Sequence, residues 1–90
     1  MPLLPRTTGR FKKDIKLMRR RGKEMSKLRT VIQKLIDRLP LEPRHRDHPL
    51  VGYYVGRREC HVEPDWLLIY MLSDKWILFE RTGTHSDLFE

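Results

Sequence analysis

The segment RECHVEPDWLLIY, residues 58–70, places several chemically capable side chains directly before a long apolar run. Cys60, His61, Glu63 and Asp65 can bind metals, exchange protons or form ordinary contacts at the edge of a strand. A chain of ninety residues has little core to spare. The first question is therefore why four polar side chains lie next to the most apolar segment of the chain.

Zinc binding is one interpretation of these residues. Suitable donors occur at Cys60, His61, Asp65, His48 and His85, but the chain has no CxxC pair and no HxxxH step. Cys60 and His61 are adjacent, so an extended backbone points them to opposite faces. A lone cysteine is also more typical of a small buried side chain than of a nucleophile. We therefore expect no metal and no other cofactor.

Acid/base chemistry without a metal fits the residue types better. Histidine titrates near neutrality, a carboxylate can orient or replace it, and arginine stabilises developing phosphate charge. On a basic surface these groups can cleave RNA, because a base activates the 2′-hydroxyl and an acid protonates the departing 5′-oxygen. Composition and spacing alone favour a structural or surface role for any single histidine at a strand end over a catalytic one.

Two amphipathic helices are predicted in the N-terminal half. Apolar residues at 11, 15 and 18 have helical spacing after a cap at Thr7 or Thr8, and Gly22 ends this helix. Apolar residues at 25, 28, 32, 35 and 39 repeat the pattern until Pro40 stops it. Residues 3–6 can form a short strand, which Pro2 and Pro5 confine to a sheet edge.

Strand patterns dominate the C-terminal half, after a proline-rich connecting loop at residues 40–52. We predict strands at residues 53–57, 67–72 and 76–81, with residues 73–75 as the turn of an antiparallel hairpin. The order of helices and strands predicts one α+β domain, residues 1–90, with two helices packed on a small antiparallel sheet. Counting outward from the hairpin turn brings Asp65, His61 and His85 to one end of that sheet.

The net charge of +7 and the pI near 10.0 predict attraction to a polyanion. The basic helix faces are the candidates for contact with such a polyanion, although charges on an amphipathic helix are often only solvated. The residues concerned are Lys12, Lys13, Lys16, Arg19, Arg20 and Arg21. No signal-peptide core is visible, and the run at residues 66–72 is far shorter than the roughly 20 residues of a membrane span. We expect a cytoplasmic protein without membrane contact.

Three segments, KDIKLMRRRG, DHPLVGYYVGRRECHVEPDWLLIY and FERTGTHSDLF, closely resemble the YafQ branch of the RelE superfamily of bacterial type II toxins. The resemblance runs from about Phe11 to Phe89. It implies a RelE-like α+β fold and a metal-independent endoribonuclease that cuts mRNA in the ribosomal A site. It also implies a cognate antitoxin as partner, besides the ribosome and mRNA, and a toxin that is monomeric when alone. With a ribosomal partner implied, the six basic residues from Lys12 to Arg21 named above become the candidates for ribosomal RNA contact.

The resemblance assigns site residues by position. The family pattern falls on His48, His61, Asp65, Trp66, His85 and Phe89. His85 is expected to act as the acid, Asp65 or His48 as the base, and His61 to hold the scissile phosphate, with Arg81 a weaker candidate for that task. Trp66 and Phe89 are expected to stack on bases. Core packing is the alternative for Trp66, and Glu63 and Cys60 are expected to be structural.

Two other hypotheses remain open at this point. One is a basic RNA-binding or ribosome-binding module whose histidines do no chemistry, in which His85→Ala changes no phenotype. The other is a zinc-dependent domain, which predicts metal in the purified protein. The match of three histidines, an aspartate and two aromatic residues to the family pattern favours the enzyme.

Overall fold

The computed structural model describes residues 1–89, and two amphipathic helices follow its first strand. Helix α1, Gly9–Arg20, starts after Thr8, whose Oγ1 accepts a hydrogen bond from the Phe11 N–H at 3.0 Å. Helix α2, Met25–Ile36, ends before the position predicted from Pro40. Arg38 has a φ of 60°, a left-handed conformation that cannot continue the helix.

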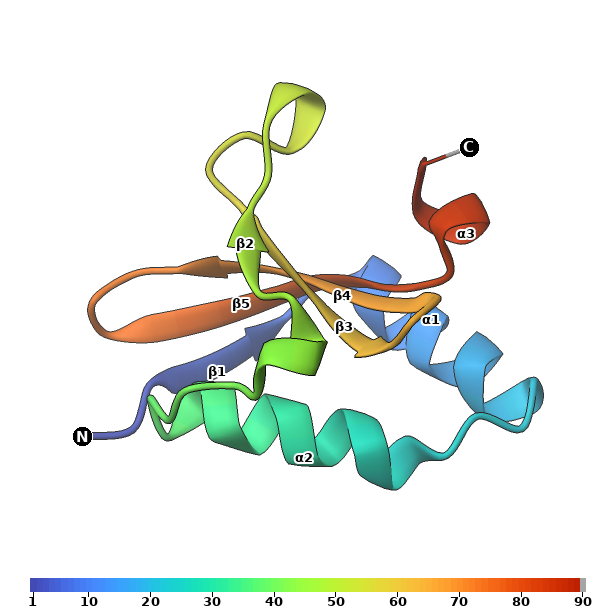
Figure 1. Ribbon diagram of the computed structural model, residues 1–90, viewed down its shortest axis with the longest axis horizontal. Coiled ribbons are helices and arrows are strands. Elements are labelled where there is room, and N and C mark those ends of the chain that lie inside the picture. Colours follow the sequence, from blue (N-terminus) through green and yellow to red (C-terminus); the bar gives the residue numbers. More distant parts are fainter. Residues whose placement is uncertain (90) are drawn as a thin grey trace.

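A five-stranded mixed sheet with the order β1-β5-β4-β3-β2 packs against these helices (Figure 1). Strand β1 is parallel to β5, whereas the other neighbouring pairs are antiparallel as predicted. The predicted edge strand is therefore present, and it makes the sheet mixed rather than purely antiparallel. The strand bounds are β1 Leu4–Thr7, β2 His48–Pro49, β3 Arg58–Glu63, β4 Trp66–Leu72 and β5 Trp76–Gly83.

The predicted strand at residues 53–57 is wrong. This segment belongs to a loop with a short 3₁₀ helix, η2, Gly52–Tyr54. Gly52 and Gly56 have φ values of 69° and 90°, and such positive values do not fit a strand. Strand β3 follows instead and was not predicted as a strand. The loop expected at residues 40–52 contains a second 3₁₀ helix, η1, Pro43–His45, and the short strand β2.

Strand β4 is buried on both faces, which explains its continuous apolar sequence. Trp66, Leu68 and Tyr70 belong to the core that includes the helices α1 and α2. Leu67 and Ile69 belong to a second, smaller core that includes Leu88 of the C-terminal helix α3, His85–Phe89. In Figure 1 this helix and the loop of residues 50–57 stand on the side of the sheet away from α2.

None of the helices within residues 1–89 has the length and apolar character of a membrane span.

Candidate active site

Strand β3 separates core residues from site residues by simple alternation. Cys60 and Val62 are buried in the core beneath the helices. Glu59 and His61 lie on the opposite face, as the period of two in a strand requires. Burial raises the pKa of the Cys60 thiol far above its usual range, so Cys60 is a structural residue.

A histidine and carboxylate cluster lies on this second face. His48 Nε2 is 2.9 Å from Glu59 Oε2, and its Nδ1 is 3.0 Å from the carbonyl oxygen of Pro49. Both ring nitrogens of His48 therefore face oxygen atoms, one of which belongs to the Glu59 carboxylate. His61 Nε2 lies 4.0 Å from the same Glu59 oxygen, and its Nδ1 is 3.1 Å from the Pro64 carbonyl. Glu59 Oε1 is buried and has no hydrogen-bond partner within residues 1–89.

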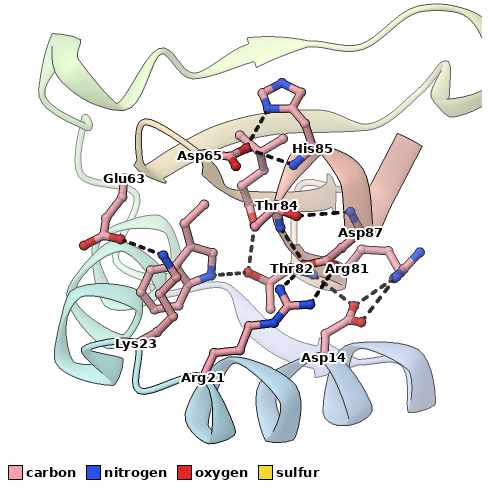
Figure 2. A network of polar contacts seen from close by, with 12 residues as sticks. Asp14, Arg21, Lys23, Glu63, Asp65, Arg81, Thr82, Thr84, His85 and Asp87 are labelled. Atoms are coloured by element: carbon pink, nitrogen blue, oxygen red, sulfur yellow. Dashed lines mark hydrogen bonds and ion pairs between the residues drawn. The ribbon is translucent and has the colours of Figure 1, made fainter. Parts of the chain in front are cut away.

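A second pair forms at the start of α3. Asp65 Oδ1 accepts the backbone N–H of His85 at 3.0 Å and lies 3.0 Å from its ring Nδ1 (Figure 2). The backbone hydrogen bond, followed by the ring hydrogen bond, lowers the pKa of Asp65. This contact assigns the Nδ1 proton to the bond with Asp65 and leaves Nε2 for another partner. The His61 and His85 ring centroids are 6.1 Å apart, close enough for one phosphate group to contact both rings.

The short helix α3 is held in place by a cap and an ion pair. Asp87 Oδ2 accepts the Thr84 N–H at 2.9 Å, and the Asp87 N–H donates to Thr84 Oγ1 at 3.1 Å. Arg21 donates to both Asp87 carboxylate oxygens, at 2.7 and 3.0 Å. The Arg21 hydrogen bonds lower the pKa of Asp87 to about 2. Gly83 is required here because a Cβ would lie 2.9 Å from the Asp87 side chain.

Arg21 therefore differs from the other basic residues predicted to contact ribosomal RNA. Its guanidinium spans from the end of α1 to α3, where Asp87 occupies it (Figure 2). This bidentate pair corrects the prediction, since Arg21 supports the segment that carries His85. The remaining candidates are exposed on α1 and form no ion pair within residues 1–89: Lys12, Lys13, Lys16, Arg19 and Arg20.

Two predicted substrate contacts also need correction. Trp66 is fully buried and donates from Nε1 to Thr82 Oγ1 at 2.9 Å, so its ring packs in the core and is not available to a base. Arg81 donates from Nε to Asp14 Oδ2 at 2.8 Å, and Asp14 also accepts the Thr82 N–H at 3.1 Å. This pair joins α1 to β5 and occupies the Arg81 guanidinium (Figure 2).

Phe89 has the environment expected of a substrate contact. Its side chain is 45% exposed, and its ring centroid lies 5.9 Å from that of His85. The Tyr54 ring meets it edge to face at 5.7 Å. Phe89 thus offers an exposed aromatic surface next to His85.

One group within residues 1–89 has the geometry of a metal site. The donor atoms of His48, Glu59 and His61 lie within 4.8 Å of one another. Two imidazoles and a carboxylate suit zinc, copper or another divalent transition metal. This set contains Glu59 where the zinc hypothesis considered Cys60, Asp65 and His85.

Glu59 is the member of this cluster that sequence reasoning missed. It shares a strand face with His61 because the two are two residues apart. That alternation was available in the segment RECHVE once it was assigned to a strand. The contact with His48 depends on the short pairing of β2 with β3, His48 opposite Glu59, which no local pattern indicated.

Residues 4–90 match the family described as "Bacterial toxin of type II toxin-antitoxin system, YafQ", and the chain belongs to that family. It is 52% identical over 83 residues to the mRNA interferase toxin YafQ of Escherichia coli K12, covering 91% of this chain and 90% of that protein. The predicted family is therefore confirmed.

Solved structures agree with the fold. The crystal structure of the E. coli DinJ-YafQ toxin-antitoxin complex contains a chain with a TM-score of 0.93 and 47% identity, covering 100% of both chains. A metal-bound toxin from Helicobacter pylori has a TM-score of 0.90 and 37% identity, covering 97% of this chain and 99% of that one. The predicted α+β class with two N-terminal helices is thus confirmed.

Proposed function

We propose that this toxin is an mRNA interferase that cleaves mRNA in the ribosomal A site by attack of the 2′-hydroxyl on the neighbouring phosphate. The observation that carries this proposal is the presence of two proton-handling pairs on either side of His61. One is His48–Glu59, and the other is His85–Asp65. A base and an acid facing one phosphate are the groups this reaction needs.

The hydrogen bonds favour particular roles. The His48–Glu59 pair is suited to draw the proton from the 2′-hydroxyl, because His48 is half exposed and its Nε2 lies 2.9 Å from the Glu59 carboxylate, a proton acceptor. Asp65 already receives two hydrogen bonds from His85, so orienting that ring suits it better than acting as the base. His85 Nε2 then delivers a proton to the departing 5′-oxygen, and His61 holds the phosphate between the two pairs. Phe89 stacks on a base of the substrate.

The test is expression of the wild type, His85→Ala and Ser86→Ala, with new mRNA 5′ ends mapped against the reading frame. Ser86 is the matched control, because it is exposed on the same helix. We expect cuts at a fixed frame position within translated codons for the wild type and Ser86→Ala, and none for His85→Ala. Cuts in untranslated regions would contradict ribosome dependence. Equal effects of all three proteins would favour the non-catalytic binding module.

A chelator experiment separates the metal-independent reaction from a metal-dependent one. We propose that cleavage by purified toxin on programmed ribosomes persists after EDTA treatment. The cluster of His48, Glu59 and His61 supports the opposite possibility. Loss of cleavage with EDTA, restored by one added divalent metal, would make that cluster a metal centre and overturn the proposed route.

We further propose that a cognate antitoxin binds this cytoplasmic toxin, which is monomeric when alone. The net charge of +7 favours an acidic antitoxin segment, and the similar E. coli toxin was solved in complex with DinJ. Gel filtration should show a monomer alone and a stoichiometric complex with the protein encoded beside it. Equal complex formation with an unrelated acidic protein would contradict specific recognition.

A further inference from the structure

Aromatic rings continue outward from the proposed catalytic centre to the tip of the loop of residues 50–57. The His85 and Phe89 centroids are 5.9 Å apart, Phe89 and Tyr54 are 5.7 Å apart, and Tyr54 and Tyr53 are 5.2 Å apart. Tyr54 packs against the smaller core, whereas Tyr53 is 92% exposed. Packing therefore explains Tyr54 but gives no reason for the outermost ring.

A basic hollow of about 390 Å³ adjoins the same two tyrosines. This volume is within the roughly 300–1,000 Å³ of small-molecule sites. Three arginines and one glutamate line it together with the tyrosines: Arg10, Arg57, Arg81 and Glu80.

The charges of the hollow are only partly satisfied within the protein. Arg57 donates to Glu80 at 2.9 Å, and Arg81 is held by Asp14. Arg10 lies in the first turn of α1, is exposed, and has no acidic partner within residues 1–89. An unpaired guanidinium beside exposed aromatic faces is the combination that binds single-stranded nucleic acid.

We propose that Tyr53 and the hollow beside it bind a nucleotide of the mRNA next to the scissile phosphate. The Tyr53 ring stacks on the base, Tyr54 supports that ring from behind, and Arg10 contacts the backbone phosphate. The site deepens the proposed function and depends on it, because the ring series ends at the proposed acid, His85. It would extend the substrate surface by at least one nucleotide beyond Phe89.

The chemistry of the loop favours RNA over a protein partner. Val51 and Val55 are also exposed, by 85% and 66%, and an apolar protein surface could cover them. The hollow itself, however, contains Arg10, which has no acidic partner within residues 1–89, and its Tyr54 ring meets Phe89 edge to face. A phosphate and a planar base match these features together, whereas an apolar partner matches only the valines.

The first experiment compares Tyr53→Ala with Val51→Ala on ribosomes programmed with a defined mRNA. Val51 is the control because it is exposed on the same loop and does not line the hollow. From the usual strength of base stacking we expect Tyr53→Ala to raise KM by about 5- to 100-fold with kcat little changed. Val51→Ala should match the wild type, and Tyr53→Trp should restore the KM. An unchanged KM for Tyr53→Ala would overturn the proposal.

The second experiment removes the base instead of the ring. An abasic residue is placed in turn at each position flanking the cleavage site. At one position the wild type should lose as much binding as Tyr53→Ala does, and the variant should lose nothing further there. Additive losses at every position would show that Tyr53 contacts no base. Arg10→Ala should weaken binding of all these mRNAs and lower the salt dependence, whereas Arg29→Ala, on the far helix, should do neither.

A non-cleavable 2′-O-methyl mRNA separates this proposal from the nuclease itself. If the wild type cleaves no mRNA but Tyr53→Ala still weakens binding of this analogue, the nuclease assignment fails and the nucleotide site stands. If the wild type cleaves and Tyr53→Ala changes neither cleavage nor analogue binding, the nucleotide site fails alone. Loss of antitoxin affinity in Tyr53→Ala without loss of RNA affinity would assign the loop to a protein contact.

Discussion

The two walls of the proposed active site are built in different ways. Strand β3, which carries Glu59 and His61, is hydrogen bonded to strands on both sides and has Cys60 and Val62 in the core behind it. Helix α3, which carries the proposed acid, has five residues, of which only Leu88 is buried. Polar contacts join it to Asp65 before β4 and to Arg21 after α1, and Phe89 meets Tyr54 edge to face.

This difference predicts different effects of substitutions in the two walls on activity and on stability. A five-residue helix is not stable by itself, so its neighbours determine its orientation. Exposed polar pairs contribute little to the free energy of unfolding, typically about 0–1 kcal/mol each. Substitutions in the polar contacts of α3 should therefore change activity with little change in stability. Substitutions in the core behind β3 should change both together.

Glu59→Gln tests the strand wall and has the largest expected effect. Removing the carboxylate should lower kcat by about 10²- to 10⁴-fold, the usual contribution of a general base. The melting temperature should be retained, because the amide keeps the shape of the buried side chain. Cleavage of programmed ribosomes and thermal unfolding measure the two quantities.

The matched control is Glu63→Gln at the end of the same strand, where Glu63 pairs with Lys23 and Lys27. It should leave kcat near the wild-type value. If Glu63→Gln lowers kcat as much as Glu59→Gln, the assignment of Glu59 as proton acceptor is wrong.

Gly83→Ala tests the helix wall by steric displacement. The new Cβ would lie 2.9 Å from the Asp87 Cβ and Oδ2 atoms, so Asp87 must move and the cap of α3 must open. We expect kcat to fall by at least about tenfold, which corresponds to about 1.4 kcal/mol in the barrier. Gly9→Ala is the control, because a Cβ there meets no atom within 4 Å. Equal activities of the two variants would show that α3 tolerates displacement.

Arg21→Ala and Arg20→Ala compare a paired arginine with an unpaired neighbour. Arg21→Ala should lower kcat several-fold, because Asp87 loses its bidentate partner and α3 loses its tether to α1. Arg20→Ala should instead weaken ribosome binding and reduce its salt dependence, with kcat unchanged. Stopped-flow binding and single-turnover cleavage distinguish the two effects. The reverse pattern would return Arg21 to the ribosome-binding surface.

Acid should loosen the helix wall before the strand wall, and this is the smallest expected effect. The pKa of Asp87 is about 2 in the folded protein, below its ordinary value of 3.8. The Asp87 contacts therefore stabilise α3 fully above about pH 4 and are lost as the pH falls toward 2. NMR shifts of α3 should move in that window ahead of those of β4. Asp87→Asn should remove the early change in the α3 shifts. If the shifts of α3 and β4 change at the same pH in the wild type, the Asp87 contacts do not stabilise α3 independently of the sheet.

The contrast between the walls also explains how far the sequence could predict the site. Helical spacing and the turn at residues 73–75 are local patterns, so they predicted both helices and the hairpin. Counting from that turn brought His61, Asp65 and His85 to one end of the sheet, where the structure has them. These successes depend on contacts that are near in sequence or tied to one hairpin.

Contacts between distant segments could not be predicted in this way. Arg21 and Asp87 are 66 residues apart, and no spacing rule relates a helix end to a C-terminal turn. The sequence allowed two interpretations of Trp66, because a tryptophan beside an active site can face the substrate or the core. Its full burial and its hydrogen bond to Thr82 show that it packs in the core. Residues 53–57 have strand composition, but the positive φ values of Gly52, just before the segment, and Gly56, within it, override that composition.

The reactivity of Cys60, which lies in β3 on the face away from the proposed site, can report whether this strand is packed against the helices. Cys60 lies between Glu59 and His61 in sequence, is fully buried, and has a raised pKa. Oxidants and alkylating reagents attack an accessible thiolate, and folded Cys60 provides neither the access nor the charge. The proposed site should therefore keep its geometry in an oxidising cell. Any modification of Cys60 would report the moments at which β3 separates from the helices beneath it.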